Sequence, residues 1–255
     1  MDILTVAYTD IGIRKEANED SLLVKIADTP LGKVVLAIIA DGMGGLSKGE
    51  LASASVIRAF SDWFDLELPE QLAAGNWDDI QYRWERMIKE QNHRIAEYGR
   101  SERIQLGTTL TALLVIGNQF RMIAHVGDSR VYRINEGIEI LTDDQTVVGR
   151  DIKRGLLTPE QARKDPRRNV LLQCIGASRL VEPEYIYGQA VPGEVYVLCS
   201  DGFRHMISEE EIYSAFRPAE LLDETVMEQR ARAMVELNKQ RQETDNISVL
   251  LVKFL

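Results

Sequence analysis

The sequence has few of the residues that would build a covalent framework or a membrane anchor. Its only two cysteines, Cys174 and Cys199, are too few for a disulfide framework and favour a reducing setting. The longest apolar runs are about seven residues, far short of the roughly 20 needed to cross a bilayer. The first ten residues, MDILTVAYTD, are acidic rather than basic and do not follow a signal-peptide pattern. We therefore expect a cytoplasmic protein.

Basic residues are also outnumbered by acidic residues. The chain carries 40 acidic against 30 basic residues, a formal charge of −10. This balance argues against a nucleic-acid or anionic-membrane partner, because phosphate backbones are bound by net basic faces. A phosphorylated substrate remains compatible, since bound divalent metal ions invert the local field. The three histidines, His93, His125 and His205, show no metal-ligand spacing.

One apolar stretch is long enough to be the centre of the fold. Val34 to Ala40 are apolar without a break and rich in β-branched types, which indicates a strand buried on both faces. The run ends at Asp41, and three of the next four residues are glycine. A carboxylate at a buried strand's end, beside a backbone that turns tightly, suits a hard cation. A hairpin turn with a capping aspartate explains this stretch, taken alone, equally well.

The remaining hydrophobic patterns predict an α+β fold. Two long helices are expected early, at about 47–64 and along a face with Ile80, Trp84, Met87, Ile88, Ile95 and Tyr98. A short helix is expected near 159–163 and a last one carrying Leu222, Val226, Ala233 and Leu237, with 66–76 as a loop. Alternating or buried apolar runs predict strands at 3–9, 21–26, 34–40, 108–116, 119–126, 130–134, 184–187, 194–199 and 247–252. Without a linker or repeat, this pattern indicates packed antiparallel sheets flanked by helices in one domain.

Five aspartates stand at comparable positions, each beside the start or end of a predicted strand. Unpaired carboxylates next to buried strands are costly, so a set that converges needs cations. All-oxygen ligation suits Mg²⁺ or Mn²⁺ rather than zinc. Each residue could instead cap a turn, an explanation that is stronger for one residue than for all of them. The five are Asp20, Asp41, Asp128, Asp201 and Asp245.

Six short motifs place these aspartates in a known order. They are NED at 18–20, DGMGG at 41–45, GTT at 107–109, GDSR at 127–130, SDG at 200–202 and DN at 245–246. In this order and spacing the chain resembles the metal-dependent serine/threonine protein phosphatases, the protein phosphatase 2C-like (PPM) family, in its compact bacterial form. The resemblance implies a four-layer α/β/β/α sandwich of two antiparallel sheets flanked by helices. It also implies one catalytic domain over residues 1–255, with a flap at about 146–176.

The resemblance implies a cleft that holds two Mn²⁺ or Mg²⁺ ions, with a third, weaker ion in bacterial members. In such enzymes the residue matching Asp41 bridges both ions and the carbonyl matching Gly42 binds one. Asp128, with Asp201, resembles the ligands of the third ion. The full set of metal-binding residues implied in this way is Asp20, Asp41, Gly42, Asp128, Asp201 and Asp245, with Glu19 acting through water.

The mechanism implied by the resemblance is direct attack of a metal-bridging hydroxide on phosphorus, without a covalent intermediate. Lys15 holds the place of the family's phosphate-binding arginine, but lysine is a point charge that cannot make a bidentate fork. The neighbouring Arg14 is the alternative phosphate ligand. The catalytic residues implied in this way are Asp41, Asp201, Asp245 and Lys15.

Other positions also depart from the family pattern. Met43 stands where eukaryotic relatives carry a histidine proposed as general acid, and Gln145 replaces the histidine of the family's TxDH stretch. Phe203, Arg204 and His205 follow the SDG motif where many relatives place an aspartate. No catalytic role is assigned to these residues.

Other function classes fit less well. A cysteine phosphatase needs one residue more than the four that separate Cys199 from Arg204, and a P-loop needs a terminal Lys-Ser/Thr that this glycine-rich loop lacks. The serious alternative is a phosphatase-like fold used as a non-catalytic regulatory or binding module. Degenerate members of that kind lose metal aspartates, whereas this chain keeps all of them. We expect a monomeric enzyme whose partners are phosphorylated proteins, among them a Ser/Thr kinase and its substrates.

Overall fold

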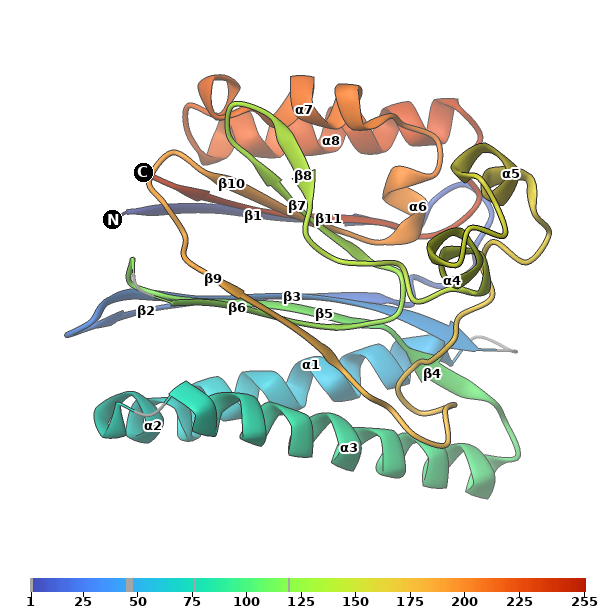
Figure 1. Cartoon of the computed structure of the whole chain (residues 1–255), viewed down its shortest axis with the longest axis horizontal. Helices are drawn as coiled ribbons and strands as arrows, with labels where there is room; N and C mark the ends of the chain where they lie inside the picture. The colour runs from blue at the N-terminus through green and yellow to red at the C-terminus, as the bar shows by residue number, and fades with distance from the viewer. Residues whose placement is uncertain (1, 45–47, 76, 119) are drawn as a thin grey trace.

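Two antiparallel β-sheets lie face to face in the computed structural model, which describes residues 2–44, 48–75, 77–118 and 120–255 (Figure 1). Expectations that fall on Gly45, on a helix start at 47 and on Gln119 lie outside the described residues. The first sheet has the order β2 (Asp20–Thr29), β3 (Gly32–Gly44), β5 (Leu110–Ile116), β6 (Phe120–Val126), β9 (Glu184–Gly188), with β4 (Leu106–Thr108) paired to the end of β3. The second has the order β1 (Ile3–Asp10), β11 (Ile247–Phe254), β10 (Val195–Cys199), β7 (Arg130–Ile134), β8 (Ile138–Ile140).

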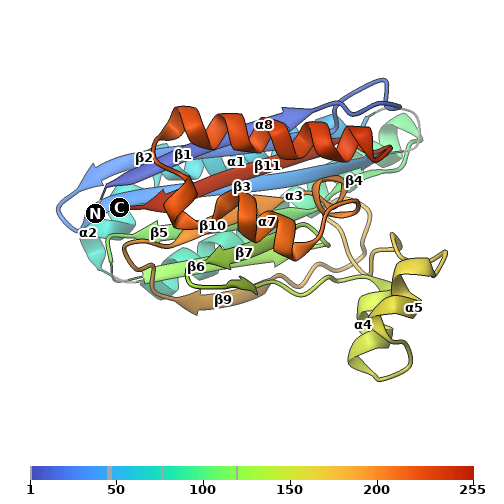
Figure 2. The same ribbon diagram turned by 90° about the horizontal axis from the view of Figure 1, so that it is seen from above.

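Helices cover the outer face of each sheet and complete four layers. The first sheet is covered by α1 (Gly49–Leu66), α2 (Leu68–Ala74) and α3 (Trp77–Glu102). The second is covered by α7 (Glu209–Phe216), the 3₁₀ turn η1 (Pro218–Glu220) and α8 (Glu224–Gln240), while α6 (Asp201–Arg204) follows β10. Two short helices, α4 (Val147–Lys153) and α5 (Pro159–Lys164), stand apart from the sandwich at one end (Figure 2). The expected α/β/β/α sandwich is therefore confirmed.

Strand β3 shows how the sequence pattern builds these layers. Val34, Leu36 and Ile38 pack toward α1 and α3, whereas the alternate residues of the strand pack between the two sheets. All seven residues from 34 to 40 are fully buried. Burying each of the larger side chains contributes about 1.5–3 kcal/mol, so neither face of the strand tolerates a polar residue. The predicted strand with two buried faces is confirmed.

The predicted loop at 66–76 is wrong over 68–74, because the structure has helix α2 there, while position 76 lies outside the described residues. Pro69 lies in the first turn, where its missing N–H has no helical partner to lose, and Gly75 ends the helix in the left-handed conformation with a φ of 69°. Leu68 is 2% exposed and joins the core under α1 and α3. Core packing of one leucine thus stabilises a helix too short to be evident from periodicity.

The predicted last helix is confirmed as α8, but one of the four residues that it was expected to carry lies outside it. Leu222 lies before α8 and is 74% exposed, because the side chain of Asp223 caps the helix by accepting a hydrogen bond from the Val226 N–H. The face that packs on the second sheet consists of Met227, Ala231, Met234 and Val235. On α3, Tyr98 is 38% exposed rather than part of the core.

Among the described helices, none is long and apolar enough to cross a membrane.

Candidate active site

The antiparallel topology brings the five predicted aspartates to one end of the sandwich. Asp20 begins β2 and is the direct cross-strand partner of Asp41 in β3. Asp201 follows the end of β10, and Asp245 precedes the start of β11, its antiparallel neighbour. Asp128 lies in the turn between β6 and β7, and β7 pairs with β10. Strand starts and ends meet at the same edge of an antiparallel sheet, so residues more than 200 positions apart converge.

The carboxylates are close enough to perturb one another. Burial, followed by repulsion from Asp201 and Asp245, raises the pKa of Asp20 to about 7. Desolvation raises the pKa of Asp41 well above its usual range, and the charges of Asp20, Asp201, Asp128 and Asp245 raise it further. The pKa of Asp128 is raised to about 7 by burial and then by Asp201. The cluster therefore carries more negative charge than its surroundings neutralise.

The GTT motif holds the backbone of Asp41. The Asp41 N–H donates to Thr109 Oγ1 at 2.9 Å, and the Thr109 N–H donates to the Asp41 carbonyl at 2.9 Å. The Thr108 hydroxyl donates to the same carbonyl at 3.0 Å. Both threonines are essentially fully buried. Neutral hydroxyl and amide groups thus position the aspartate without using up its charge.

Asp20 is held on one carboxylate oxygen only. Ser248 of β11 donates its hydroxyl to Asp20 Oδ2 at 2.5 Å. Asp20 Oδ1 is buried and finds no hydrogen-bond donor within the described part of the chain. A buried carboxylate oxygen without a donor is costly, and a cation removes that cost.

Asn246 of the DN motif ties the polar N-terminal loop to β11. Its Oδ1 accepts a hydrogen bond from the Glu19 N–H at 3.0 Å, and its Nδ2 donates to the carbonyls of Ile11 (3.0 Å) and Ala17 (3.1 Å). Glu19 in turn accepts at Oε1 from the Gly49 N–H at the start of α1, at 2.8 Å. One oxygen of Glu19 is therefore committed to the fold, which leaves the other for water.

Gly42 lets three chain segments approach closely. A Cβ at this position would lie 2.4 Å from the Gly49 carbonyl oxygen and 2.5 Å from that of Glu19. Gly202 is restricted in the same way, since its Cβ would lie 2.2 Å from the Asn246 carbonyl oxygen. The glycines of the DGMGG and SDG motifs are thus needed for packing beside the aspartates, independently of any role in chemistry.

The donor set suits hard divalent ions, although its side chains are not gathered as ligands. Across the described ranges no three His, Cys, Asp or Glu side chains are grouped tightly enough to ligate one ion as they stand. The carboxylates are nevertheless within mutual electrostatic reach, offer only oxygen donors, and include the unpartnered Oδ1 of Asp20. Mg²⁺ and Mn²⁺ favour such oxygens and commonly retain several waters.

Comparison with known proteins agrees with this arrangement. The family profile described as protein phosphatase 2C matches residues 13–242. This chain belongs to the protein phosphatase 2C family. It is 30% identical to protein phosphatase PhpP of Streptococcus pneumoniae over 96% of this chain and 94% of PhpP. The solved structure of the Streptococcus agalactiae serine/threonine phosphatase superposes with a TM-score of 0.86 at 30% identity, covering 100% of both chains.

A further relative has been solved with metal bound. The catalytic domain of the serine/threonine protein phosphatase PstP, in complex with two manganese ions, has a TM-score of 0.79 and 30% identity. It covers 98% of this chain and 97% of that domain. These relatives are named as phosphatases, which favours the enzymatic interpretation over a non-catalytic module.

The structure of this phosphatase places Lys15 rather than Arg14 beside the acidic cluster. Lys15 Nζ lies 2.6 Å from Asp245 Oδ1. Burial lowers the pKa of Lys15, but the hydrogen bond to Asp245 and the charges of Asp245, Glu19 and Asp41 outweigh it, so that the pKa is raised overall. Arg14 is exposed and makes no hydrogen bond or ion pair with the described residues.

Several polar residues of the phosphatase were not predicted from the sequence. Ser248 holds Asp20, and Arg130 of the GDSR motif forms a bidentate pair with Asp144 at 2.7 and 2.8 Å. Gln145, which stands where relatives have histidine, accepts from the Gly127 N–H at 2.9 Å and from Gln173 Nε2 at 2.9 Å. It therefore ties the two ends of the flap to the turn that carries the GDSR aspartate.

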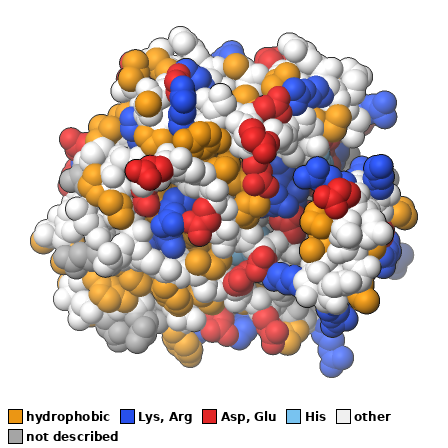
Figure 3. All heavy atoms as spheres, turned by 45° about the horizontal axis from the view of Figure 1, so that its top comes forward, with side chains coloured by type: hydrophobic (Ala, Val, Ile, Leu, Met, Phe, Trp, Pro, Cys, Tyr) orange, Lys and Arg blue, Asp and Glu red, His pale blue; other side chains and the backbone are white. Residues whose placement is uncertain are grey.

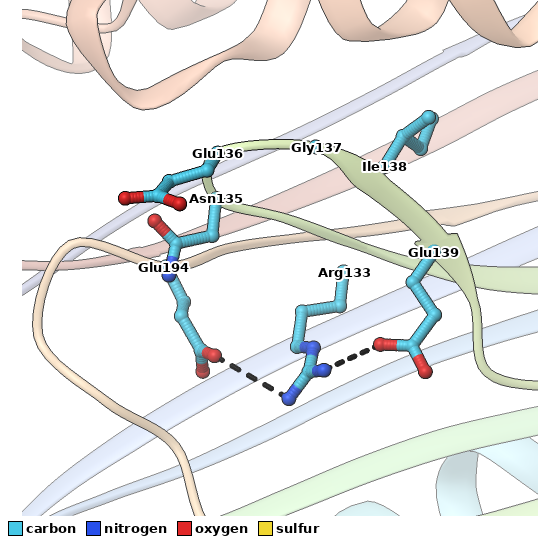
Figure 4. A pocket seen from close by; sticks show the side chains of 7 residues that line it. All are labelled: Arg133, Asn135, Glu136, Gly137, Ile138, Glu139 and Glu194. Atoms are coloured by element: carbon cyan, nitrogen blue, oxygen red, sulfur yellow. Dashed lines mark hydrogen bonds and ion pairs between the residues drawn. The ribbon is translucent and has the colours of Figure 1, made fainter.

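A cavity of about 360 Å³ lies elsewhere on the phosphatase, at the turn between β7 and β8 (Figure 4). Its Arg133 lies 2.5 Å from Glu139 and 3.6 Å from Glu194. Glu194 precedes β10, whereas Asp201 follows that strand, so the cavity is at the opposite end of β10 from the aspartates. Its only basic side chain is already paired, which gives it no means to bind a phosphate.

Proposed function

We propose that this protein is a Mn²⁺- or Mg²⁺-dependent phosphatase that hydrolyses phosphoserine and phosphothreonine in proteins. The observation that carries the proposal is the convergence of buried and half-buried, mutually repelling aspartates at one end of a sandwich of this family. Two divalent ions are the simplest source of the missing positive charge. When bound, such ions supply Lewis acidity at the phosphoryl oxygens and an activated water nucleophile.

We propose that the two ions are held by carboxylates from both sheets. Asp20 and Asp41 come from neighbouring strands of the first sheet, and Asp201 and Asp245 come from the second. The Gly42 carbonyl, at the end of β3, and a water on Glu19 complete the proposed set. Asp128 belongs to the same cluster.

Lys15 is the proposed phosphate ligand. Its ammonium group reaches Asp245 from a loop that Asn246 ties down at both ends, so the loop is ordered before substrate arrives. Since lysine has a single charged centre, it can follow a phosphoryl group from one oxygen to another, whereas an arginine would fix two oxygens. In this proposal Lys15 binds the substrate's phosphate and exchanges its contact with Asp245 for one with phosphate.

The flap is the proposed contact for the peptide part of the substrate. Lys and Arg side chains gather on the side of the molecule that carries α4 and α5 (Figure 3). Residues 146–176 contain seven basic and three acidic residues, in a chain whose formal charge is −10. A basic flap beside an acidic cleft attracts a phosphorylated segment that the rest of the surface repels.

We propose further that residues 1–255 form one catalytic domain that acts as a monomer in the cytoplasm. The resemblance to compact bacterial phosphatases implies an enzyme that opposes a Ser/Thr kinase. A Ser/Thr kinase and its substrates are therefore the proposed partners.

Hydrolysis of a phosphothreonine peptide, with and without Mn²⁺, tests the proposal. Asp41→Asn is expected to lower kcat/KM by about 10³-fold or more, since it removes one of the carboxylates that would hold the ions. The matched control is Asp28→Asn, which lies on the same β2–β3 pair but has a side chain that is 83% exposed and is expected to leave activity unchanged. Equal rates for Asp41→Asn and the wild type, or phosphate release that persists in excess chelator, would reject the proposal of a metal-dependent phosphatase. A folded protein that binds phosphopeptide without turnover would instead support the non-catalytic module.

A further inference from the structure

Arg204 is a largely buried arginine that reaches the aspartate cluster from the helix after β10. It ends helix α6, three residues after Asp201, and its side chain is 12% exposed. Its Nη2 donates to the Asp128 carbonyl at 2.9 Å. The same nitrogen lies 3.2 Å from Asp144 Oδ2 and 3.8 Å from Asp128 Oδ2.

Asp144 is shared between two arginines, because Arg204 Nη2 lies 3.2 Å from its Oδ2 and Arg130 contacts it as well. That carboxylate already has a full bidentate partner, because Arg130 donates from Nε and Nη2 to its two oxygens. One positive charge is therefore left over on this side of the cleft. In addition, Arg204 Nε has no acceptor within the described part of the chain, so the guanidinium fork is not saturated by Asp144.

The other two carboxylates within electrostatic reach of Arg204 are Asp128 and Asp201. Asp128 is 6% exposed, and the nearby Asp201 charge opposes its ionisation, whereas Arg204 favours it. His205, the next residue after Arg204, has its Nε2 3.5 Å from Asp201 Oδ2. Basic side chains from α6 and the residue after it thus face both carboxylates of the pair.

We propose that Arg204 supplies the cation for the Asp128–Asp201 pair and so excludes a third divalent ion from this side of the cleft. The inference rests on the proposed function, because it presumes the two ions proposed above, which Asp201 also helps to hold. Asp128 is then a partner of Arg204 rather than a metal ligand. A guanidinium is permanently charged, so this side of the cleft stays neutralised at any metal concentration. Arg204 acts through Asp128 and is a positioning residue.

Counting bound Mn²⁺ on the whole chain tests this inference without measuring activity. Free Mn²⁺ is followed by electron paramagnetic resonance during titration, and heats are measured by calorimetry. The wild type is expected to bind two ions and Arg204→Gln three, the third about tenfold or more weaker. Arg204→Lys keeps the charge and is the matched control, expected to bind two. Adding Asp128→Asn to Arg204→Gln is expected to return the count to two.

The outcomes separate this inference from the proposed function. No Mn²⁺ binding by the wild type would reject both. Two ions on both the wild type and Arg204→Gln, or three on the wild type, would reject the role of Arg204 and leave the phosphatase proposal standing. Asp128→Asn alone covers the case in which Arg204→Gln does not fold. It is expected to bind two ions with affinities within about twofold of the wild type, and loss of an ion or a weakening of about tenfold would overturn the inference.

Discussion

The metal-free protein should lose stability as pH rises through neutrality, and Asp20 should account for a measurable part of that loss. Asp20 is buried, one of its oxygens lacks a donor, and its pKa is raised to about 7. In the unfolded chain an aspartate titrates near its ordinary value of about 3.9. Between these values the folded state holds a proton that the unfolded state releases, so the free energy of unfolding falls as pH rises.

The size of the effect follows from the shift. About three pK units at about 1.4 kcal/mol each correspond to roughly 4 kcal/mol, present below the unfolded pKa and lost once pH exceeds the folded one. Another buried group acts in the opposite direction. Burial lowers the pKa of His125 to about 4, so its contribution is present above the ordinary histidine pKa and is lost as pH falls toward 4. The comparison of the wild type with Asp20→Asn cancels the contribution of His125.

The assay is urea unfolding of chelator-treated protein at several values from pH 5 to pH 8. Asp20→Asn is expected to have a higher free energy of unfolding than the wild type at pH 8. The difference between the two proteins should be about 3 kcal/mol smaller at pH 5. It does not vanish there, because the carboxyl of the unfolded chain is already mostly ionised at pH 5. Asp28→Asn, with its exposed side chain, should run parallel to the wild type. Saturating Mn²⁺ should remove the wild type's loss at pH 8. A gap between Asp20→Asn and the wild type that does not change with pH would refute the electrostatic reasoning.

Four further substitutions test the groups around the cluster. Asn246→Ala removes three hydrogen bonds, one buried and two partly buried, and should lower the free energy of unfolding by about 2–4 kcal/mol in urea. Thr109→Val deprives the Asp41 N–H of its acceptor and should weaken Mn²⁺ binding about tenfold by calorimetry, whereas Thr109→Ser should restore it. Lys15→Ala should raise KM for a phosphopeptide about tenfold with a smaller change in kcat, and Lys15→Arg should retain most of the affinity. Gly42→Ala places a Cβ 2.4 Å from a backbone oxygen, and the resulting shift should cost about 1–3 kcal/mol in the free energy of unfolding.

The layers and the aspartate cluster could be predicted because both depend on local signals. Seven consecutive apolar residues predict a strand with two buried faces, and β3 has them. An aspartate at the start or end of such a strand must lie at an edge of its sheet. In an antiparallel pair the start of one strand lies beside the end of its neighbour. Asp20 and Asp41 therefore become cross-strand partners without any long-range information in the sequence.

The helix faces were harder to predict because several faces of one helix can carry apolar residues. In α8 the residues at 226, 233 and 237 have helical spacing, but the buried set at 227, 231, 234 and 235 has it as well. Only the angle at which the helix meets the second sheet decides between them, and Asp223 fixes where the helix begins. Tertiary packing, rather than propensity, therefore selects the face.

The supporting residues of the site could not be read from local pattern at all. Ser248 reaches Asp20 across 228 positions, and a serine in a strand is commonplace in any sequence. The basic nature of Arg204 was visible, but its partner Asp128 lies 76 positions away. Such contacts depend on the register between strands, which spacing within a motif does not determine.

Two kinds of support can be distinguished around the five aspartates, and they have different consequences. Asp20 and Asp41 are held by neutral donors, the hydroxyls of Ser248 and Thr108 and the amide of Thr109, which fix geometry but leave the negative charge in place. Charge left in place is what draws a divalent ion, since a carboxylate that is already ion-paired must lose that partner first. Asp128 has the opposite surroundings, with a largely buried arginine at its carbonyl and carboxylate. The same fold thus keeps one part of its acidic cleft open to metal ions and closes the other with its own cation.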